Sequence, residues 1–250
     1  MQEQQHQEMF EVETTHWWFV GKRLLFRRLL GQRLDPANRA SSRILDVGCG
    51  TGAVATDFGR YGSVVATDFS PAALALARRR GVSEAVAADA TALPFADNSF
   101  DLVTAFDILE HVADDRAMVA ELARVLRPGG TVAIHVPAWP SMWSRHDEIL
   151  EHKRRYTRRG LRALLASSPL EIERVGWSSC VILPVAAAVR ALRNVTGNES
   201  ETADLGTVPP LLNRIMLGVY HAEAAAAATC GLPFGLSLAA IAVKPRKSLS

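Results

Sequence analysis

A glycine-rich turn that follows an apolar, β-branched run limits what this chain can fold into more than any other feature. The stretch RILDVGCGTGAVA covers residues 43–55, and Gly48, Gly50 and Ala53 match the spacing G-x-G-x-x-G/A. Such a turn lets the backbone at the start of a helix approach a nucleotide closely. The stretch therefore predicts a strand, a ligand-binding turn and a helix in succession.

Strand and helix patterns alternate after this turn. Ser70 and Pro71 mark the start of one helix and Gly81 marks its end. Alternation of this kind implies right-handed crossovers and a mostly parallel sheet with helices on both faces. The expected strands are 43–47, 63–68, 84–89, 100–106 and 131–137, and the expected helices are 52–62, 70–81 and 115–130.

The flanking segments follow a looser pattern. Residues 1–13 are polar and predict a frayed end, whereas 15–34 form an amphipathic helix with apolar residues at helical spacing. Residues 138–156 form an insertion rich in Trp and charge. Further on, a helix is expected at 157–168, a strand at 170–177, a long helical excursion at 178–233 and a last strand at 234–243. The length of 250 residues and the hydrophobic content of 48% suit a single α/β domain over 1–250, with 43–137 as its ligand-binding core.

Charge and cysteine content exclude several classes of protein. A formal net charge of +2 is too weak to indicate a nucleic-acid partner. Cys49, Cys180 and Cys230 form no CxxC pair, so we expect no metal site and no disulfide framework. The polar, acidic start resembles no signal peptide, and a reducing, cytoplasmic location is expected.

One uncharged segment is long enough to span a bilayer. Twenty residues lie between Glu223 and Lys244, but Gly231, Pro233 and Gly235 interrupt them at the centre. The interruption favours the end of an Ala-rich helix, a turn and a buried strand over a stable membrane span.

Three aspartates lie at or near the carboxyl ends of three of the expected strands. Asp46 precedes Gly48 by two residues, while Asp68 and Asp89 each end a strand. Open α/β sheets bind ligands at the edge where the carboxyl ends of their strands meet. A carboxylate at position 46 repels a pyrophosphate and attracts an ammonium or sulfonium ion, and Asp68 is placed to bridge ribose hydroxyls. Any one of these acids could instead be a helix cap or turn residue, but all three together predict a nucleoside ligand that carries positive charge.

Five ordered stretches carry a family resemblance. ILDVGCGTG, VVATDFSPAAL, AADATALPF, FDLVTAFDILEHV and LRPGGTVAIHVP resemble the motifs of class I S-adenosylmethionine-dependent methyltransferases, in the branch of the ubiquinone and menaquinone methyltransferases. The resemblance implies S-adenosyl-L-methionine as cofactor and S-adenosyl-L-homocysteine as product. It also implies a doubly wound, Rossmann-like, seven-stranded sheet, mostly parallel with the last strand antiparallel, with helical lid insertions at 138–156 and 178–233 and a cap helix at 15–34. The flanks HWWFVGKR and DEILEHKRRYT resemble a bacterial subgroup linked to cell-envelope or specialised metabolism.

The resemblance assigns roles to individual positions. It implies that Asp46, Gly48 and Gly50 hold the methionine portion, Asp68 the ribose, and Phe69, Asp89 and Ala90 the adenine, while Phe106 faces the amino-acid end. Trp18 and Arg23 from the cap helix complete the expected cofactor site, since an aromatic face attracts a sulfonium ion.

Candidates for a catalytic role lie in and around DILEHV. His111 is suited to act as a base near neutral pH, unless proximity alone suffices for methyl transfer. His16, His152 and Tyr156, together with Arg155, are expected to form a polar mouth, whereas the alternative for the basic run is a solvated face. His135 alternates inside a strand and is expected to be structural.

The predicted function is methyl transfer to a small-molecule acceptor with an apolar or aromatic body. One alternative is a non-catalytic module that binds S-adenosylmethionine without turnover. Another is a NAD-dependent oxidoreductase, which Asp46 disfavours. The sequence leaves the acceptor atom (O, N or C) open. It also leaves open whether 178–233 covers the site or forms a dimer interface, so both a monomer and a homodimer are consistent with it.

Overall fold

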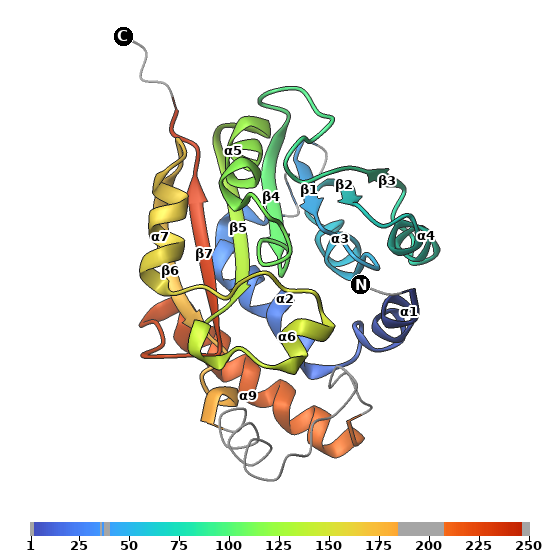
Figure 1. Ribbon diagram of the computed structural model, residues 1–250, viewed down its shortest axis with the longest axis vertical. Helices are drawn as coiled ribbons and strands as arrows, with labels where there is room; N and C mark the ends of the chain where they lie inside the picture. The colour runs from blue at the N-terminus through green and yellow to red at the C-terminus, as the bar shows by residue number, and fades with distance from the viewer. Residues whose placement is uncertain (1–2, 36, 38–40, 185–207, 247–250) are drawn as a thin grey trace.

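A seven-stranded sheet forms the centre of the computed structural model, which describes residues 3–35, 37, 41–184 and 208–246 (Figure 1). The strand order is β3-β2-β1-β4-β5-β7-β6. Among these strands only β7 runs antiparallel to its neighbours, which confirms the predicted sheet. The bounds are β1 (Arg43–Val47), β2 (Ser63–Asp68), β3 (Glu84–Ala87), β4 (Phe100–Phe106), β5 (Leu126–Pro137), β6 (Glu171–Ser178) and β7 (Ser237–Val243).

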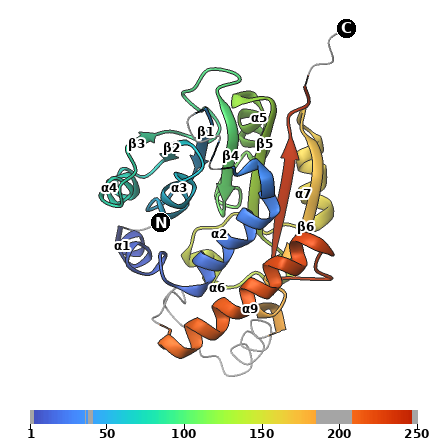
Figure 2. The same cartoon turned by 180° about the vertical axis from the view of Figure 1, so that it is seen from behind.

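Helices cover both faces of the sheet (Figures 1 and 2). α5 (Asp115–Val125) and α7 (Arg158–Ala166) bury their apolar stripes on one face, where Met118, Leu122 and Leu165 meet side chains of β4, β5 and β7. α2 (Trp17–Leu30), α3 (Ala53–Phe58) and α9 (Pro210–Thr229) cover the other face, where Phe26 and Phe58 pack with Phe106. α4 (Pro71–Arg79) packs beside α3 through small side chains.

The boundary between α5 and β5 differs from the sequence prediction. The sequence predicted a helix to residue 130 that closes on Pro128, whereas α5 ends at Val125 and the strand begins at Leu126. Leu126 pairs with Phe100 of β4, and the register shifts before the regular pairing of Thr131 with Leu102 begins. The helix therefore ends earlier than predicted, because Pro128 and the two glycines cannot continue it and Leu126 is already extended.

The amino-terminal segment is helical, which corrects the prediction that residues 1–13 are frayed. α1 (Glu3–Val12) packs against α4, and the ring of Phe10 lies 5.2 and 4.2 Å from the guanidinium carbons of Arg79 and Arg80. Met9 of the same helix approaches Gly50 in the glycine-rich turn. α1 lacks a strong apolar stripe, so these tertiary contacts rather than periodicity account for its position.

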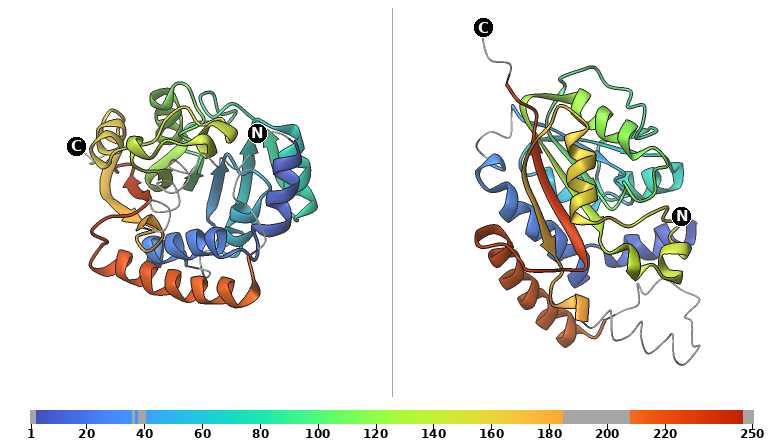
Figure 3. Two further views of the ribbon diagram at one scale, coloured as in Figure 1. Left: turned by 60° about the horizontal axis from the view of Figure 1, so that its bottom comes forward. Right: turned by 60° about the vertical axis from the view of Figure 1, so that its left-hand side comes forward.

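α9 lies alongside α2 on the outer face of the sheet (Figure 3). The ring of Tyr220 occupies the place that a side chain at position 21 would need, since a Cβ at Gly21 would lie 2.4 Å from it. Of the predicted excursion 178–233, residues 185–207 lie outside the described part of the chain. The insertion 138–156 contains η3 (Pro140–Met142) and α6 (Arg145–Ile149), and η1 (Gly31–Arg33) follows α2. None of the described helices is both long enough and apolar enough to cross a bilayer.

Candidate active site

A cavity of about 970 Å³ opens at the carboxyl ends of β1, β2 and β4, surrounded by α1, the first half of α2 and α6 (Figure 1). This is the edge where ligands bind open α/β sheets. The predicted residues that line it are Trp18, Arg23, Gly48, Gly50, Asp68, Phe69, Asp89, Ala90, Phe106, His111 and His152. Asp46, His16 and Tyr156 are not among the lining residues.

The glycine-rich turn leaves backbone exposed to the cavity. Gly48 and Gly50 adopt φ values of 70° and 52°, which side chains other than glycine rarely tolerate. A Cβ at Gly48 would also lie 2.7 Å from Ile108. Asp68 accepts hydrogen bonds from the Gly50 and Ser70 amides, both at 2.9 Å. The carboxylate is therefore fixed by the backbone and keeps lone pairs for ligand hydroxyls.

Asp46 lies beneath the turn rather than on the cavity wall. It is 2% exposed, and its Oδ1 accepts a hydrogen bond of 2.7 Å from the Thr104 hydroxyl. Burial raises its pKa to about 7, and Oδ2 has no hydrogen-bond partner among the described residues. Such a carboxyl favours a cationic group just above the turn, because a positive charge there compensates the cost of burial.

The adenine end has two contrasting residues. Phe69 is 80% exposed, which is unusual for a large aromatic side chain, and it stands at the cavity wall after β2. Asp89 closes a turn by accepting hydrogen bonds from the amide and hydroxyl of Thr91, which lower its pKa. Asp89 is therefore both a turn residue and a cavity residue.

Glu13 closes the cavity from the side of α1, and the sequence analysis missed it. Its carboxylate accepts a hydrogen bond from Thr51 and pairs with Arg80 at 2.8 Å, while Arg23 donates to its backbone carbonyl at 2.9 Å. Burial raises the pKa of Glu13 to about 7 in spite of Arg80 and Arg23. No local sequence motif identifies Glu13, because it reaches the cavity only when α1 packs on α4.

Asp107 lies at the other end of the cavity in a fixed network. It adopts a positive φ of 53°, forms an ion pair with Lys22, and contacts Nδ1 of His135 at 2.6 Å. His135 in turn contacts the Ser178 hydroxyl at 3.2 Å. Desolvation alone would raise the pKa of Asp107, but Lys22 and His135 hold it well below its usual range. His135 thus has the structural position predicted for it, while Lys22 and Asp107 are cavity residues that the sequence analysis missed.

Glu110, His111 and His152 lie together next to this network. Glu110 is 1% exposed, and neither carboxyl oxygen has a hydrogen-bond partner among the described residues. Burial raises its pKa well above the usual value, and the charge of Asp107 adds to this. The rings of His111 and His152 meet edge to face with their centroids 4.7 Å apart. Burial, and to a smaller extent the charge of His152, lowers the pKa of His111 to about 4.

Asp147 of α6 holds the second of these histidines. Its carboxylate accepts from Arg155 at 2.7 Å and lies 2.9 Å from Nδ1 of His152. Burial alone would raise the pKa of Asp147, but these two partners hold it below its usual range. The ring orientation of His152 is therefore fixed through Nδ1, and the side chain lines the cavity.

The predicted polar mouth does not form as a set. Tyr156 is buried, and its hydroxyl lies 3.2 Å from the Leu109 carbonyl and 3.0 Å from Asp115, away from the cavity lining. His16 caps α2 by accepting a hydrogen bond of 3.2 Å from the Trp18 amide. Both side chains are engaged in local structure, whereas His152 and Arg155 do line the cavity.

Comparisons with known proteins agree with this geometry. A family model described as a methyltransferase domain matches residues 45–134. A demethylmenaquinone methyltransferase from Corynebacterium glutamicum is 33% identical over 180 residues, which cover 64% of this chain and 77% of that relative. A ubiquinone biosynthesis O-methyltransferase from Xanthomonas oryzae pv. oryzae is 35% identical over 133 residues, covering 48% of this chain and 56% of the relative.

Solved structures share the fold. Geranyl diphosphate C-methyltransferase from Streptomyces coelicolor superposes with a TM-score of 0.60 at 16% identity, covering 89% of this chain and 79% of that one. The [4+2]-cyclase SpnF superposes with a TM-score of 0.53 at 21% identity, covering 89% and 81%. A methyltransferase and a cyclase thus share this fold, so the fold alone does not show the family, and membership is argued from the sequence relatives. Their identity and coverage show that the chain belongs to the class I S-adenosylmethionine-dependent methyltransferases.

Proposed function

We propose that this protein methylates a small-molecule acceptor with an apolar or aromatic body. The observation that carries the proposal is that a nucleoside-type end and a buried polar end share one cavity. The names of the quinone methyltransferase relatives support the acceptor class. The likeness of the flanks to a bacterial subgroup supports a place in specialised or cell-envelope metabolism.

The cofactor end fits S-adenosylmethionine through residues of this chain. Asp68 would hold the ribose hydroxyls, Phe69 would cover the adenine ring, and the buried carboxyl of Asp46 would favour the positive charge near Gly48 and Gly50. The bound cofactor supplies an activated methyl group. The protein aligns the acceptor with that methyl group and excludes water.

The acceptor end combines apolar walls with polar groups at one side. Trp18, Phe19, Ile108, Leu150 and Leu236 are the apolar residues of the same cavity on which the proposal draws. Lys22, Asp107, Glu110, His111 and His152 supply the polar side. An apolar or aromatic body would pack against the walls while a hydroxyl or similar group meets the polar side.

Incubation with methyl-labelled S-adenosylmethionine tests the proposal. The acceptors are a short-chain demethylmenaquinol, a catechol and a simple phenol, with the polar amine sarcosine as a negative comparison, and products are measured by mass spectrometry. We expect labelled product and S-adenosylhomocysteine in equal amounts with at least one aromatic acceptor. Asp68→Ala serves as the cofactor control and should lower the labelling rate by at least about tenfold when the cofactor is below saturation. Cofactor binding without transfer to any aromatic acceptor would instead support the alternative of a non-catalytic binding module.

A further inference from the structure

We propose that Glu110, His111 and His152 form a binding site for one divalent transition-metal ion at the acceptor end of the cavity. One ligand atom from each of the three side chains can be chosen so that all lie within 4.8 Å of one another. No metal site was expected from the sequence, because the three cysteines form no CxxC pair. His152 also lies in the insertion after β5, about 40 residues from Glu110, so no local motif shows the set.

The buried carboxyl of Glu110 is the first reason for this assignment. The side chain is 1% exposed, lines the cavity, and has no hydrogen-bond partner for either oxygen in the described part of the chain. A buried polar group without a partner is costly and calls for an explanation, such as an ion. The two cations whose charges oppose the rise in the Glu110 pKa have other partners: Lys22 pairs with Asp107, and Arg155 pairs with Asp147 and the Ala138 carbonyl.

The orientation of His152 is the second reason. Asp147 holds Nδ1 at 2.9 Å, and this arrangement of a carboxylate behind a histidine is characteristic of metal-ligating histidines. It fixes the tautomer with Nε2 free to bind an ion. Asp147 is itself fully buried and is fixed by Arg155 and by the Ser144 amide at 2.9 Å.

The donor set specifies the class of ion. Two imidazole nitrogens and one carboxylate suit Zn²⁺ and related transition-metal ions rather than Mg²⁺ or Ca²⁺. At ligand distances of about 2.1 Å, a tetrahedral ion sets its ligands about 3.4 Å apart, so the atoms, which lie within 4.8 Å of one another, must close by at most about 1.4 Å. Three protein ligands leave a position open for an acceptor oxygen, whose proton the ion would make more acidic. This last step rests on the proposed function.

Metal binding is measured directly, without acceptor or cofactor. The full-length protein is stripped with a chelator, and Co²⁺ is titrated while its visible d–d absorption is recorded. We expect one Co²⁺ per chain, displaced by Zn²⁺. His152→Ala and Glu110→Gln should each weaken binding by more than about 100-fold, and Asp147→Asn by about 10–100-fold.

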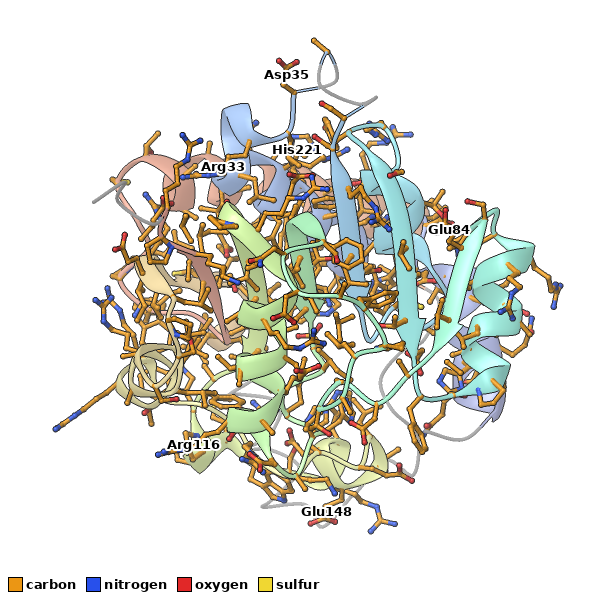
Figure 4. All side chains as sticks on the ribbon, turned by 90° about the horizontal axis from the view of Figure 1, so that it is seen from above. Arg33, Asp35, Glu84, Arg116, Glu148 and His221 are labelled. Atoms are coloured by element: carbon orange, nitrogen blue, oxygen red, sulfur yellow. The ribbon has the colours of Figure 1, made fainter. Side chains whose placement is uncertain are left out.

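His221→Ala is the matched control, because it removes a histidine that is exposed on α9 and lies across the molecule from Glu148 of α6 (Figure 4). It should bind Co²⁺ as the wild-type protein does. Thermal melts establish that each variant folds, and His152→Ala keeps the test usable if Glu110→Gln does not. Equal Co²⁺ binding by wild type and His152→Ala, or no binding by wild type, would overturn the site.

The outcomes for the metal and for methyl transfer are separable. Stoichiometric Co²⁺ binding that depends on His152 establishes the site even if no acceptor is methylated, in which case only the proposed function fails. Full methyl transfer by chelated protein that binds no Co²⁺ refutes the site and leaves the proposed function intact.

Discussion

Replacing Glu13 by Gln should remove a pH dependence of folding stability that the wild-type protein carries. Burial raises the pKa of Glu13 from 4.5 to about 7, although Arg80 lies 2.8 Å away. The cost of desolvating the carboxylate thus exceeds the attraction of its partner. A folded-state pKa above the unfolded value means that the stabilising contribution is fully present below about pH 4.5 and is lost as pH rises through about 7.

The pKa difference sets the magnitude. About 2.5 pKa units at 1.36 kcal/mol each correspond to roughly 3 kcal/mol between pH 4.5 and pH 8. Urea denaturation of wild type and Glu13→Gln across this range gives the free energy of unfolding at each pH. Wild type should lose up to about 3 kcal/mol relative to the variant as pH rises, since other titrating groups cancel in the difference.

A second variant separates burial from loss of charge. Glu84→Gln removes a carboxylate that stands exposed at the start of β3 (Figure 4), and its pH curve should run parallel to that of wild type. If the curve of unfolding free energy against pH for Glu13→Gln were also parallel to that of wild type, burial of Glu13 would not control its ionisation. The closure of α1 over the cavity would then need another explanation.

Three further outcomes are expected. Asp68→Ala should weaken S-adenosylhomocysteine binding by at least about tenfold in calorimetry, because a fixed carboxylate loses charge-assisted hydrogen bonds to ligand hydroxyls; unchanged affinity would remove Asp68 from the cofactor site. Binding of S-adenosylmethionine near pH 7 should release up to about one proton, because a cation lowers the pKa values of Asp46 and Glu13, both about 7. Calorimetry in buffers of different ionisation enthalpy measures the number of protons released, and proton uptake would contradict the prediction. Tyr156→Phe should lower the free energy of unfolding by about 1–2 kcal/mol and leave cofactor affinity unchanged, since its hydroxyl bonds only to Leu109 and Asp115 within the described residues. A large loss of cofactor affinity would show that Tyr156 contributes to the binding site.

The elements of the sheet were largely predictable from sequence. β1, β2 and β4 have the predicted bounds, because short β-branched runs between turn residues specify buried parallel strands. That Gly48, Gly50, Asp68 and Phe69 share one cavity wall was also predictable, since the family motifs place them at the ends of those strands; their role in holding the cofactor stays a prediction.

The acceptor end was less predictable, because its residues come from distant segments. Lys22 reaches Asp107 across 85 positions, and Asp147 holds His152 only after the insertion has folded as α6. Tyr156 was misplaced for a related reason. In a run of polar residues, sequence alone does not show which side chains turn toward the cavity and which, like Tyr156, pack beneath Leu109.

The position of β7 constrains the order in which the chain can fold during its synthesis. β7 lies between β5 and β6 although it follows both in sequence. A nascent chain that ends before Ser237 therefore has strands β1–β5 available for pairing, but β5 has an open edge and β6 has no partner. On the ribosome, β6 must wait for β7 before it can join the sheet, and during this interval the edge of β5 that β7 later covers is unpaired.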